Sequence, residues 1–115
     1  TAGTCTMQSN KPINATSGVG TFTVQTGATL NAQGFALTGS ALYNQQAGAT
    51  LITASADGVG SDPALTTGSI RLSGTKTFTA GANYTFSGTA AQTTGNLMGT
   101  TIGNLTIANT GTTNN

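Results

Sequence analysis

The stretch TGATL at Thr26–Leu30 returns 21 residues later as AGATL at Ala47–Leu51. A third version, AGANY at Ala80–Tyr84, follows after a further 33 residues, which is one more period plus an insertion of 12. A recurrence of about 20–50 residues usually marks units that bury their apolar faces by stacking on their neighbours. The repeat therefore predicts a stack of similar units.

Short alternating segments lie between the repeats. In Thr21–Gln25, Phe22 and Val24 fall on one side of a predicted strand, and further short strands are expected at 29–31 and 35–38. Three strands and three Gly-rich corners in about 21 residues match one coil of a single-stranded parallel β-solenoid. An antiparallel β-sandwich is the alternative, because the same alternation and turn spacing could build it.

The chain divides into three predicted regions. Residues 1–19 form a segment that leads into the stack and partly caps it, 20–110 form the solenoid, and 111–115 form a polar tail or linker. Asp-Gly and Asp-Pro turn signals gather near the middle, which predicts a loop excursion at about 55–67.

The large apolar side chains on the inner sides of these strands are the predicted structural core. They are Phe22, Val24, Leu30, Phe35, Leu37, Leu42, Leu51, Ile70, Leu72, Phe78, Tyr84, Phe86, Leu105 and Ile107. The end coils of such a stack leave backbone N–H and C=O groups unpaired, so we expect them to be capped or to continue into more protein.

Ionisable side chains are scarce. The chain has three Lys or Arg, two Asp, no Glu and no His, for a net charge of +1. Three scattered cations are too few for a nucleic-acid surface, and without His neither a Ser-His-Asp nor a Cys-His site can form. We therefore expect no enzyme, no cofactor and no nucleic-acid partner.

Asp57 and Asp62 are the only side-chain carboxylates and lie in one predicted loop. With backbone carbonyls they are weak candidates for a Ca²⁺ site, although two Asp residues in Asx-type turns account for them as well. Cys5 is the single cysteine and cannot form an internal disulfide. It is interpreted as an inert thiol, as half of an intermolecular bridge, or as the partner of a cysteine in a segment missing from this chain. Without an apolar run of about 18 residues, no membrane insertion is expected.

Threonine rows on the outer faces suggest a second function. Thr21 and Thr23, and then Thr75, Thr77 and Thr79, would form flat arrays of methyl and hydroxyl groups. Such a face could bind ice or glycans, although Thr is also an ordinary outward residue of a strand.

Six phrases of the chain together resemble a known kind of repeat. They are GATL at 48–51, SADG at 55–58, GSIRL at 68–72, TFTAGANYTF at 77–86, GTAAQTTG at 88–95 and GNLTI at 103–107. In order and spacing they resemble the Gly/Thr/Asn-rich repeats of large secreted surface proteins of Bacteroidetes, which are exported by the type IX route. This resemblance implies a parallel β-solenoid in an adhesin at the cell surface, and it carries over no functional residues.

The sequence thus predicts a non-catalytic, extracellular structural module of a cell-surface adhesin stalk or of a self-assembling filament. The expected partner is another copy of the chain or the remainder of a longer polypeptide, because few charges oppose association. A flat Thr-rich face that binds glycan or ice is the alternative, with surface glycans as the partner.

Overall fold

The computed structural model describes residues 3–16, 20–61 and 65–111, and these residues form eleven β-strands and no α-helix. None of the described segments is a helix able to cross a membrane. The strands are β1 (Thr4–Thr6), β2 (Lys11–Pro12), β3 (Thr21–Val24), β4 (Thr29–Gln33), β5 (Leu37–Gly39), β6 (Leu42–Gln45), β7 (Thr50–Thr53), β8 (Ile70–Leu72), β9 (Lys76–Phe78), β10 (Ala82–Phe86) and β11 (Ile102–Ile107).

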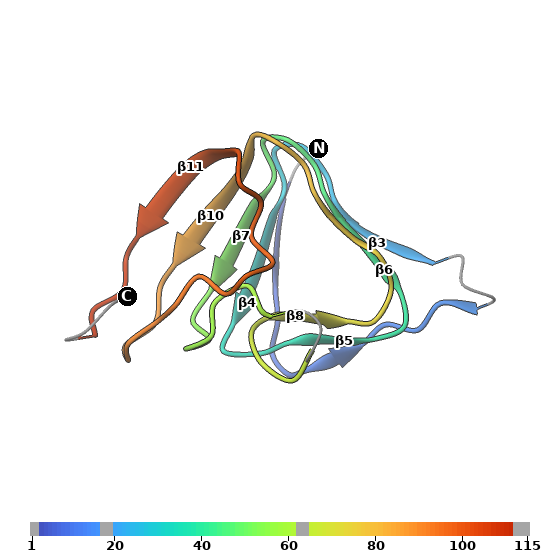
Figure 1. Ribbon diagram of the computed structural model, residues 1–115, viewed down its shortest axis with the longest axis horizontal. Helices are drawn as coiled ribbons and strands as arrows, with labels where there is room; N and C mark the ends of the chain where they lie inside the picture. Colours follow the sequence, from blue (N-terminus) through green and yellow to red (C-terminus); the bar gives the residue numbers. More distant parts are fainter. Residues whose placement is uncertain (1–2, 17–19, 62–64, 112–115) are drawn as a thin grey trace.

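The strands form three parallel sheets about a common core (Figure 1). Sheet A has the order β1-β4-β7-β10-β11, sheet B the order β2-β5-β8, and sheet C the order β3-β6-β9. Apart from the β10–β11 pair, each strand pairs with the strand three places earlier in the chain. Since every pair among the described strands is parallel, the antiparallel sandwich considered above is wrong.

The 21-residue repeat appears in sheet A as a strand register. Leu30 pairs with Leu51, and Leu51 pairs with Tyr84, so equivalent residues of the three phrases stand side by side. The second residue of each phrase is a glycine with positive φ, at 80° for Gly27, 74° for Gly48 and 87° for Gly81. Glycine adopts this left-handed conformation without the steric cost of a Cβ, so the repeated phrase encodes one corner followed by one strand.

The core draws side chains from all three sheets. Of the predicted core residues, Phe22, Phe35 and Phe78 are half-buried against it. The fully buried members of the prediction are Val24, Leu30, Leu37, Leu51, Ile70, Leu72, Tyr84 and Phe86. Small side chains, which the sequence analysis did not include, fill the space between them: Ala32, Ala36, Ala41, Ala49 and Ala82.

Leu42 is a wrong core assignment. It lies on the outer side of β6 and is only half-buried, whereas its neighbour Tyr43 is buried. The cause is the register of sheet C, in which Phe22 pairs with Tyr43. Because side chains alternate along a strand, placing Tyr43 inside necessarily turns Leu42 outward.

Leu105 and Ile107 were expected in the core but are exposed, at 47% and 58% of their surface. Their direction follows the prediction, since they pair with the buried Tyr84 and Phe86 of β10. Their burial does not, because β11 is the last strand of sheet A and no further strand covers it. The inner side of β11 is therefore an open apolar surface.

The predicted loop at 55–67 is partly interior. Val59 is fully buried; its N–H donates to Thr94 O at 3.0 Å, and its carbonyl accepts from Ile70 N at 2.8 Å. A Cβ at Gly68 would overlap the backbone of Gly60. The glycines of this segment thus serve close backbone packing as well as turns.

The predicted outer regions are only partly described. Within 1–19, β1 pairs with β4 and β2 pairs with β5, so this segment already supplies strands to sheets A and B. The tail at 111–115 lies outside the described residues except for Gly111, whose N–H donates to Asn109 Oδ1 at 2.6 Å.

Candidate functional site

Within the part of the chain that the structure describes, the charged side chains do not gather into one site. Asp57 is exposed, and Asp62, the other Ca²⁺ candidate, lies outside the described residues. Across 3–16, 20–61 and 65–111, no group of three or more His, Cys, Asp and Glu side chains could hold a metal ion. Arg71 Nε donates to Gly68 O at 2.9 Å, and Lys76 Nζ donates to Leu72 O at 2.9 Å. These two cations therefore hold turns of their own chain.

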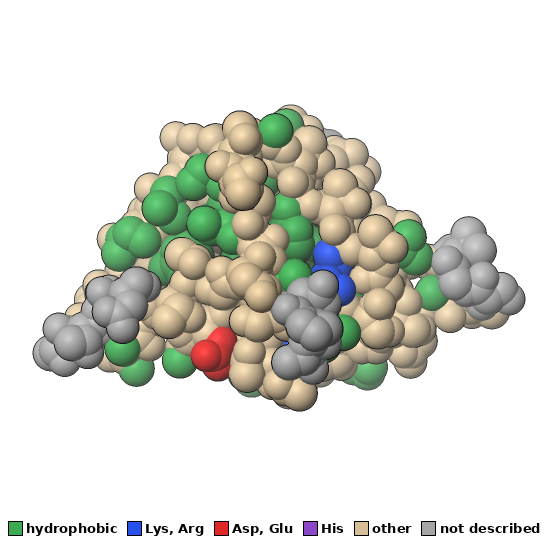
Figure 2. Space-filling view, viewed as in Figure 1, with side chains coloured by type: hydrophobic (Ala, Val, Ile, Leu, Met, Phe, Trp, Pro, Cys, Tyr) green, Lys and Arg blue, Asp and Glu red, His purple; other side chains and the backbone are tan. Residues whose placement is uncertain are grey.

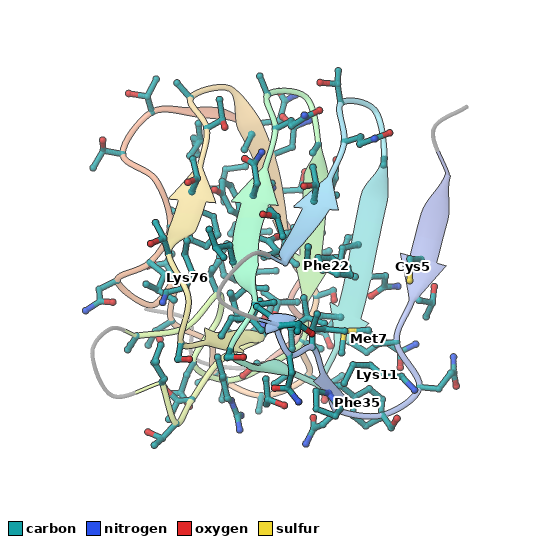
Figure 3. All side chains as sticks on the ribbon, turned by 90° about the vertical axis from the view of Figure 1, so that its right-hand side faces the viewer. Cys5, Met7, Lys11, Phe22, Phe35 and Lys76 are labelled. Atoms are coloured by element: carbon teal, nitrogen blue, oxygen red, sulfur yellow. The ribbon has the colours of Figure 1, made fainter. Side chains whose placement is uncertain are left out.

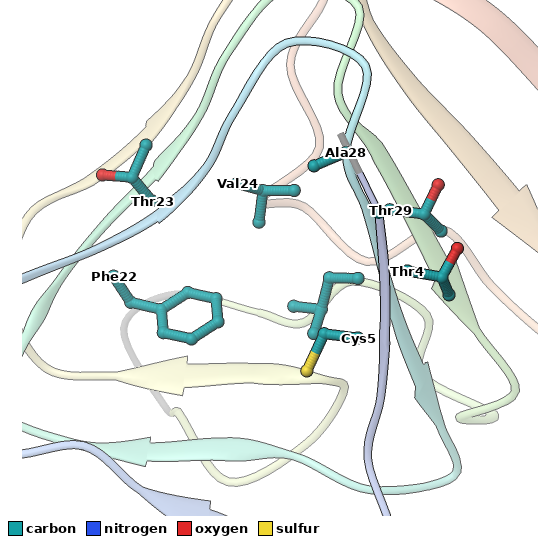
Figure 4. A pocket seen from close by; sticks show the side chains of 9 residues that line it. Thr4, Cys5, Phe22, Thr23, Val24, Ala28 and Thr29 are labelled. Atoms are coloured by element: carbon teal, nitrogen blue, oxygen red, sulfur yellow. The ribbon is translucent and has the colours of Figure 1, made fainter. Parts of the chain in front are cut away.

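The first candidate surface is the N-terminal end of the stack. A cavity of about 260 Å³ opens there, and its apolar walls include Phe22, Val24 and Ala28. Figure 4 shows Cys5 pointing into the same space as Phe22 and Val24, while Thr4 and Thr29 point away. Cys5 is an exposed free thiol because β1, its strand, has a neighbour on one side only, as its place at the edge in Figure 3 illustrates.

The second candidate surface is the C-terminal end. Figure 2 shows hydrophobic side chains gathered where β10 and β11 lie in the view of Figure 1. Leu105 and Ile107 are its exposed members, and the half-buried Leu97, Met98 and Ile102 pack against the core beneath them. An open apolar end of this kind marks an interaction surface more often than a solvated face.

The register joins the two ends through a single line of residues. Cys5 pairs with Leu30, Leu30 with Leu51, Leu51 with Tyr84, and Tyr84 with Leu105. We call these five residues the core column. Its three middle members are buried by neighbours on both sides, whereas Cys5 and Leu105 each have a neighbour on one side only.

The outer faces carry the predicted threonines. Thr21 and Thr23 of β3 and Thr77 of β9 are exposed on sheet C, but β6 between them presents Leu42 and Asn44. A longer array, missed in the sequence analysis, lies on sheet A. Its outward positions form two lines across the sheet: Thr4, Thr29, Thr50 and Asn83, and then Thr6, Asn31, Ile52, Thr85 and Thr106. The signal for it was present as the triplets TCT at 4–6, TLN at 29–31, NYT at 83–85 and NLT at 104–106, although TLI at 50–52 interrupts the series.

Two buried glutamines join successive strands from within. Gln45 Nε2 donates to Ala49 O at 3.2 Å and to Asn83 O at 3.0 Å, and its Oε1 accepts from the Tyr43 hydroxyl at 3.3 Å. All of its main hydrogen-bonding groups are thus satisfied inside the core, where an unpaired amide would be costly. Gln45 acts as a polar bridge between β6, the following turn and β10.

Gln92 plays the same part near the C-terminal end. Its Nε2 donates to Thr53 O at 3.1 Å and to Ser55 O at 2.9 Å, while its Oε1 accepts from Gly88 N at 2.8 Å. This single side chain holds the segment after β10 against the chain that follows β7. Sequence reasoning missed both glutamines because their polar side chains carry no periodic apolar signal.

Two tyrosines of the core have perturbed pKa values. Burial raises the pKa of Tyr43 far above its ordinary value, and the proximity of Tyr84 adds to the rise. Burial also raises the pKa of Tyr84, whose buried hydroxyl has no hydrogen-bond partner among the described residues. Both phenols stay neutral at physiological pH and serve packing: the Tyr43 ring stacks on Phe22 at 6.3 Å between centroids.

Comparison of the chain with protein-family models, curated proteins and solved structures found no match. The two open ends and the outer faces are the surfaces on which a function of this chain can rest.

Proposed function

We propose that the chain is a parallel β-solenoid with coils of about 21 residues. We further propose that it serves as a non-catalytic, extracellular structural module, in a cell-surface adhesin stalk or a self-assembling filament. The proposal extends the resemblance to secreted surface repeats of Bacteroidetes. Its expected partners are copies of itself or the remainder of a longer polypeptide.

One observation carries the proposal: the core column crosses sheet A from strand to strand and ends at β1 and β11, each of which pairs with a neighbour on one side only. In a parallel sheet the strand edge is the surface that accepts the next strand. A stack that ends in this way gains buried area and hydrogen bonds from more of the same structure. The near absence of charge supports this use, because little repulsion opposes contact.

Sedimentation velocity and electron microscopy of the purified chain over a wide concentration range test the proposal. We expect discrete growth from monomers to elongated particles as the concentration rises. The expected particles lengthen along one axis, because only the two ends of the stack offer free strand edges. A single monomeric species at every concentration would overturn self-assembly through these ends.

A second candidate function rests on the outer face of sheet A. Its two lines of Thr and Asn, interrupted by Ile52, present uncharged methyl, hydroxyl and amide groups at the strand spacing of about 4.8 Å. A regular, flat array of this kind suits an ordered surface such as ice or a polysaccharide. Ice-recrystallisation and glycan-array assays test it. Loss of binding in Thr50→Arg, with retention in the sheet C control Thr23→Arg, is the expected result; no binding by the unaltered chain would refute it.

A further inference from the structure

We infer that the C-terminal end of one copy binds the N-terminal end of a second copy, with β1 of the second copy added to β11 of the first. Leu105 of the first copy then lies beside Cys5 of the second. This inference rests on the proposed function and deepens it by naming the partner and the register.

The edges of sheet A are complementary in direction. β1 uses one edge to pair with β4, and β11 uses the opposite edge to pair with β10, so their free edges face opposite ways along the stack. A second copy can be placed beyond β11 by the same translation that separates neighbouring strands of sheet A. The free edge of its β1 then faces the free edge of β11, and the two strands run parallel. Two like edges brought together would instead pair antiparallel, through a two-fold axis. Only the head-to-tail arrangement continues the existing hydrogen-bond pattern.

The two ends also match in chemistry. The C-terminal end offers Leu105 and Ile107 as exposed apolar side chains, and the N-terminal end offers the apolar cavity of about 260 Å³ beside Phe22 and Cys5. No charged residue lines that cavity, and the residues of β11 that would face it, Leu105 and Ile107, are apolar. Contact between the two ends therefore buries apolar surface without the cost of desolvating a charged side chain.

The register follows from the core column. Adding Cys5 of a second copy after Leu105 lengthens the column by the same step that separates its present members. The same step places Met7 beside Ile107 on the inner side, and Thr6 beside Thr106 on the outer side. A slip by one residue would instead bring the outward threonines of the second copy's β1, Thr4 and Thr6, beside the inward Leu105 and Ile107 of the first copy. The burial pattern therefore selects the Cys5–Leu105 register over its immediate neighbours.

This register makes Cys5 a distance probe. Paired residues on neighbouring strands lie about 4.8 Å apart, which is inside the Cα range of about 4.4–6.8 Å that a disulfide requires. Within one chain, position 105 lies four strand spacings from Cys5, or about 19 Å. A disulfide between these positions can therefore form only between two chains.

The experiment mixes two proteins with one cysteine each. The unaltered chain supplies Cys5, and the double variant Cys5→Ser/Leu105→Cys supplies the thiol at the other end. Oxidised glutathione is added to the mixture, and the products are separated without reductant and mapped by mass spectrometry. We expect a covalent heterodimer through positions 5 and 105 as the main cross-linked product.

The matched control is Cys5→Ser/Thr106→Cys, in which the thiol is one residue away but on the outer face. We expect it to form heterodimer at least about tenfold more slowly, and both variants should keep the circular dichroism spectrum of the parent. Equal rates at 105 and 106, a majority of 5–5 or 105–105 homodimers, or no heterodimer would each overturn the inference. Growth in sedimentation without this heterodimer would leave the proposed function standing and refute the register alone.

Discussion

Leu51→Ala tests the central position of the core column. Leu51 is fully buried in β7, with Leu30 on one side and Tyr84 on the other. Both neighbours lie in strands held by parallel hydrogen-bond ladders, so they cannot move inward far to fill the space left by the leucine. The perturbation should therefore create a cavity rather than a local collapse.

The magnitude follows from that rigidity. Buried Leu→Ala substitutions cost about 2.7–5.0 kcal/mol, with larger values where the cavity persists. For Leu51 we expect a loss of about 4 kcal/mol in the free energy of unfolding. In a chain of this size, with about 4 °C per kcal/mol, this corresponds to a fall in Tm of about 15 °C.

Guanidinium unfolding followed by circular dichroism measures the loss. The protein is kept dilute, because association of folded copies would add stability by mass action. Ile52→Ala is the matched control: Ile52 is the next residue of β7 and points outward, half-buried. We expect it to cost less than about 1.5 kcal/mol. Equal losses in the two variants would refute the reasoning, because they would mean that the inner and outer sides of β7 do not differ.

Three further predictions concern other parts of the core. Leu30→Cys should form an internal disulfide with Cys5, its register partner, and mass spectrometry without reductant should detect it in the monomer; a free pair of thiols after oxidation would contradict the register. Stability should fall as the pH rises above about 10, because Tyr43 and Tyr84 keep their protons when folded but lose them when unfolded. Urea unfolding from pH 8 to 11.5 measures this fall, and a Phe substitution at each should flatten it; an unchanged slope would count against burial as the cause. Gln92→Leu should cost about 1–3 kcal/mol in denaturant unfolding, because the Gly88 N–H loses its acceptor and the carbonyls of Thr53 and Ser55 each lose one of their donors; a loss below about 0.5 kcal/mol would argue against this bridge.

The parallel architecture could be predicted because the repeat keeps both the glycine of the turn and the leucine of the strand that follows it. Gly27 and Gly48 take the same positive φ, and Leu30 and Leu51 occupy the same place after the turn. A repeat of corner and strand together fixes the lag between partners, and that lag is incompatible with a simple antiparallel hairpin. The repeat period therefore predicted which strands pair across more than 20 residues. The β-propensities of individual residues cannot predict such pairing.

The error at β6 shows where such reasoning stops. Leu42 and Tyr43 are adjacent and both apolar, so the sequence fits either phase of alternation. The structure chooses Tyr43 because its ring stacks on Phe22 and its hydroxyl reaches the buried Gln45. That choice depends on a ring contact with β3 and on a buried glutamine within β6, and a pattern of apolar residues predicts neither.

The wrong prediction that Leu105 and Ile107 of β11 are buried had a different cause. Nothing in the residues from Ile102 to Ile107 distinguishes them from a buried strand, and their register with β10 is that of one. Burial depends on whether another strand follows, which is a property of the neighbours and not of the strand. The same holds for Cys5, whose equivalents Leu30 and Leu51 are buried.

The scarcity of charge bears on how specificity can arise at these ends. Arg71 and Lys76 are engaged with backbone carbonyls of their own turns, which leaves Lys11 and Asp57 as the described ionic side chains without such a role. Electrostatic complementarity, which usually steers and selects partners, therefore has little to act on here. Selection falls instead to strand direction and to the alternation of inner and outer side chains, since a misplaced partner would leave edge hydrogen bonds unmade and apolar side chains in water. This is why we propose another copy of this chain as the partner, since it carries the same strand directions and the same alternation.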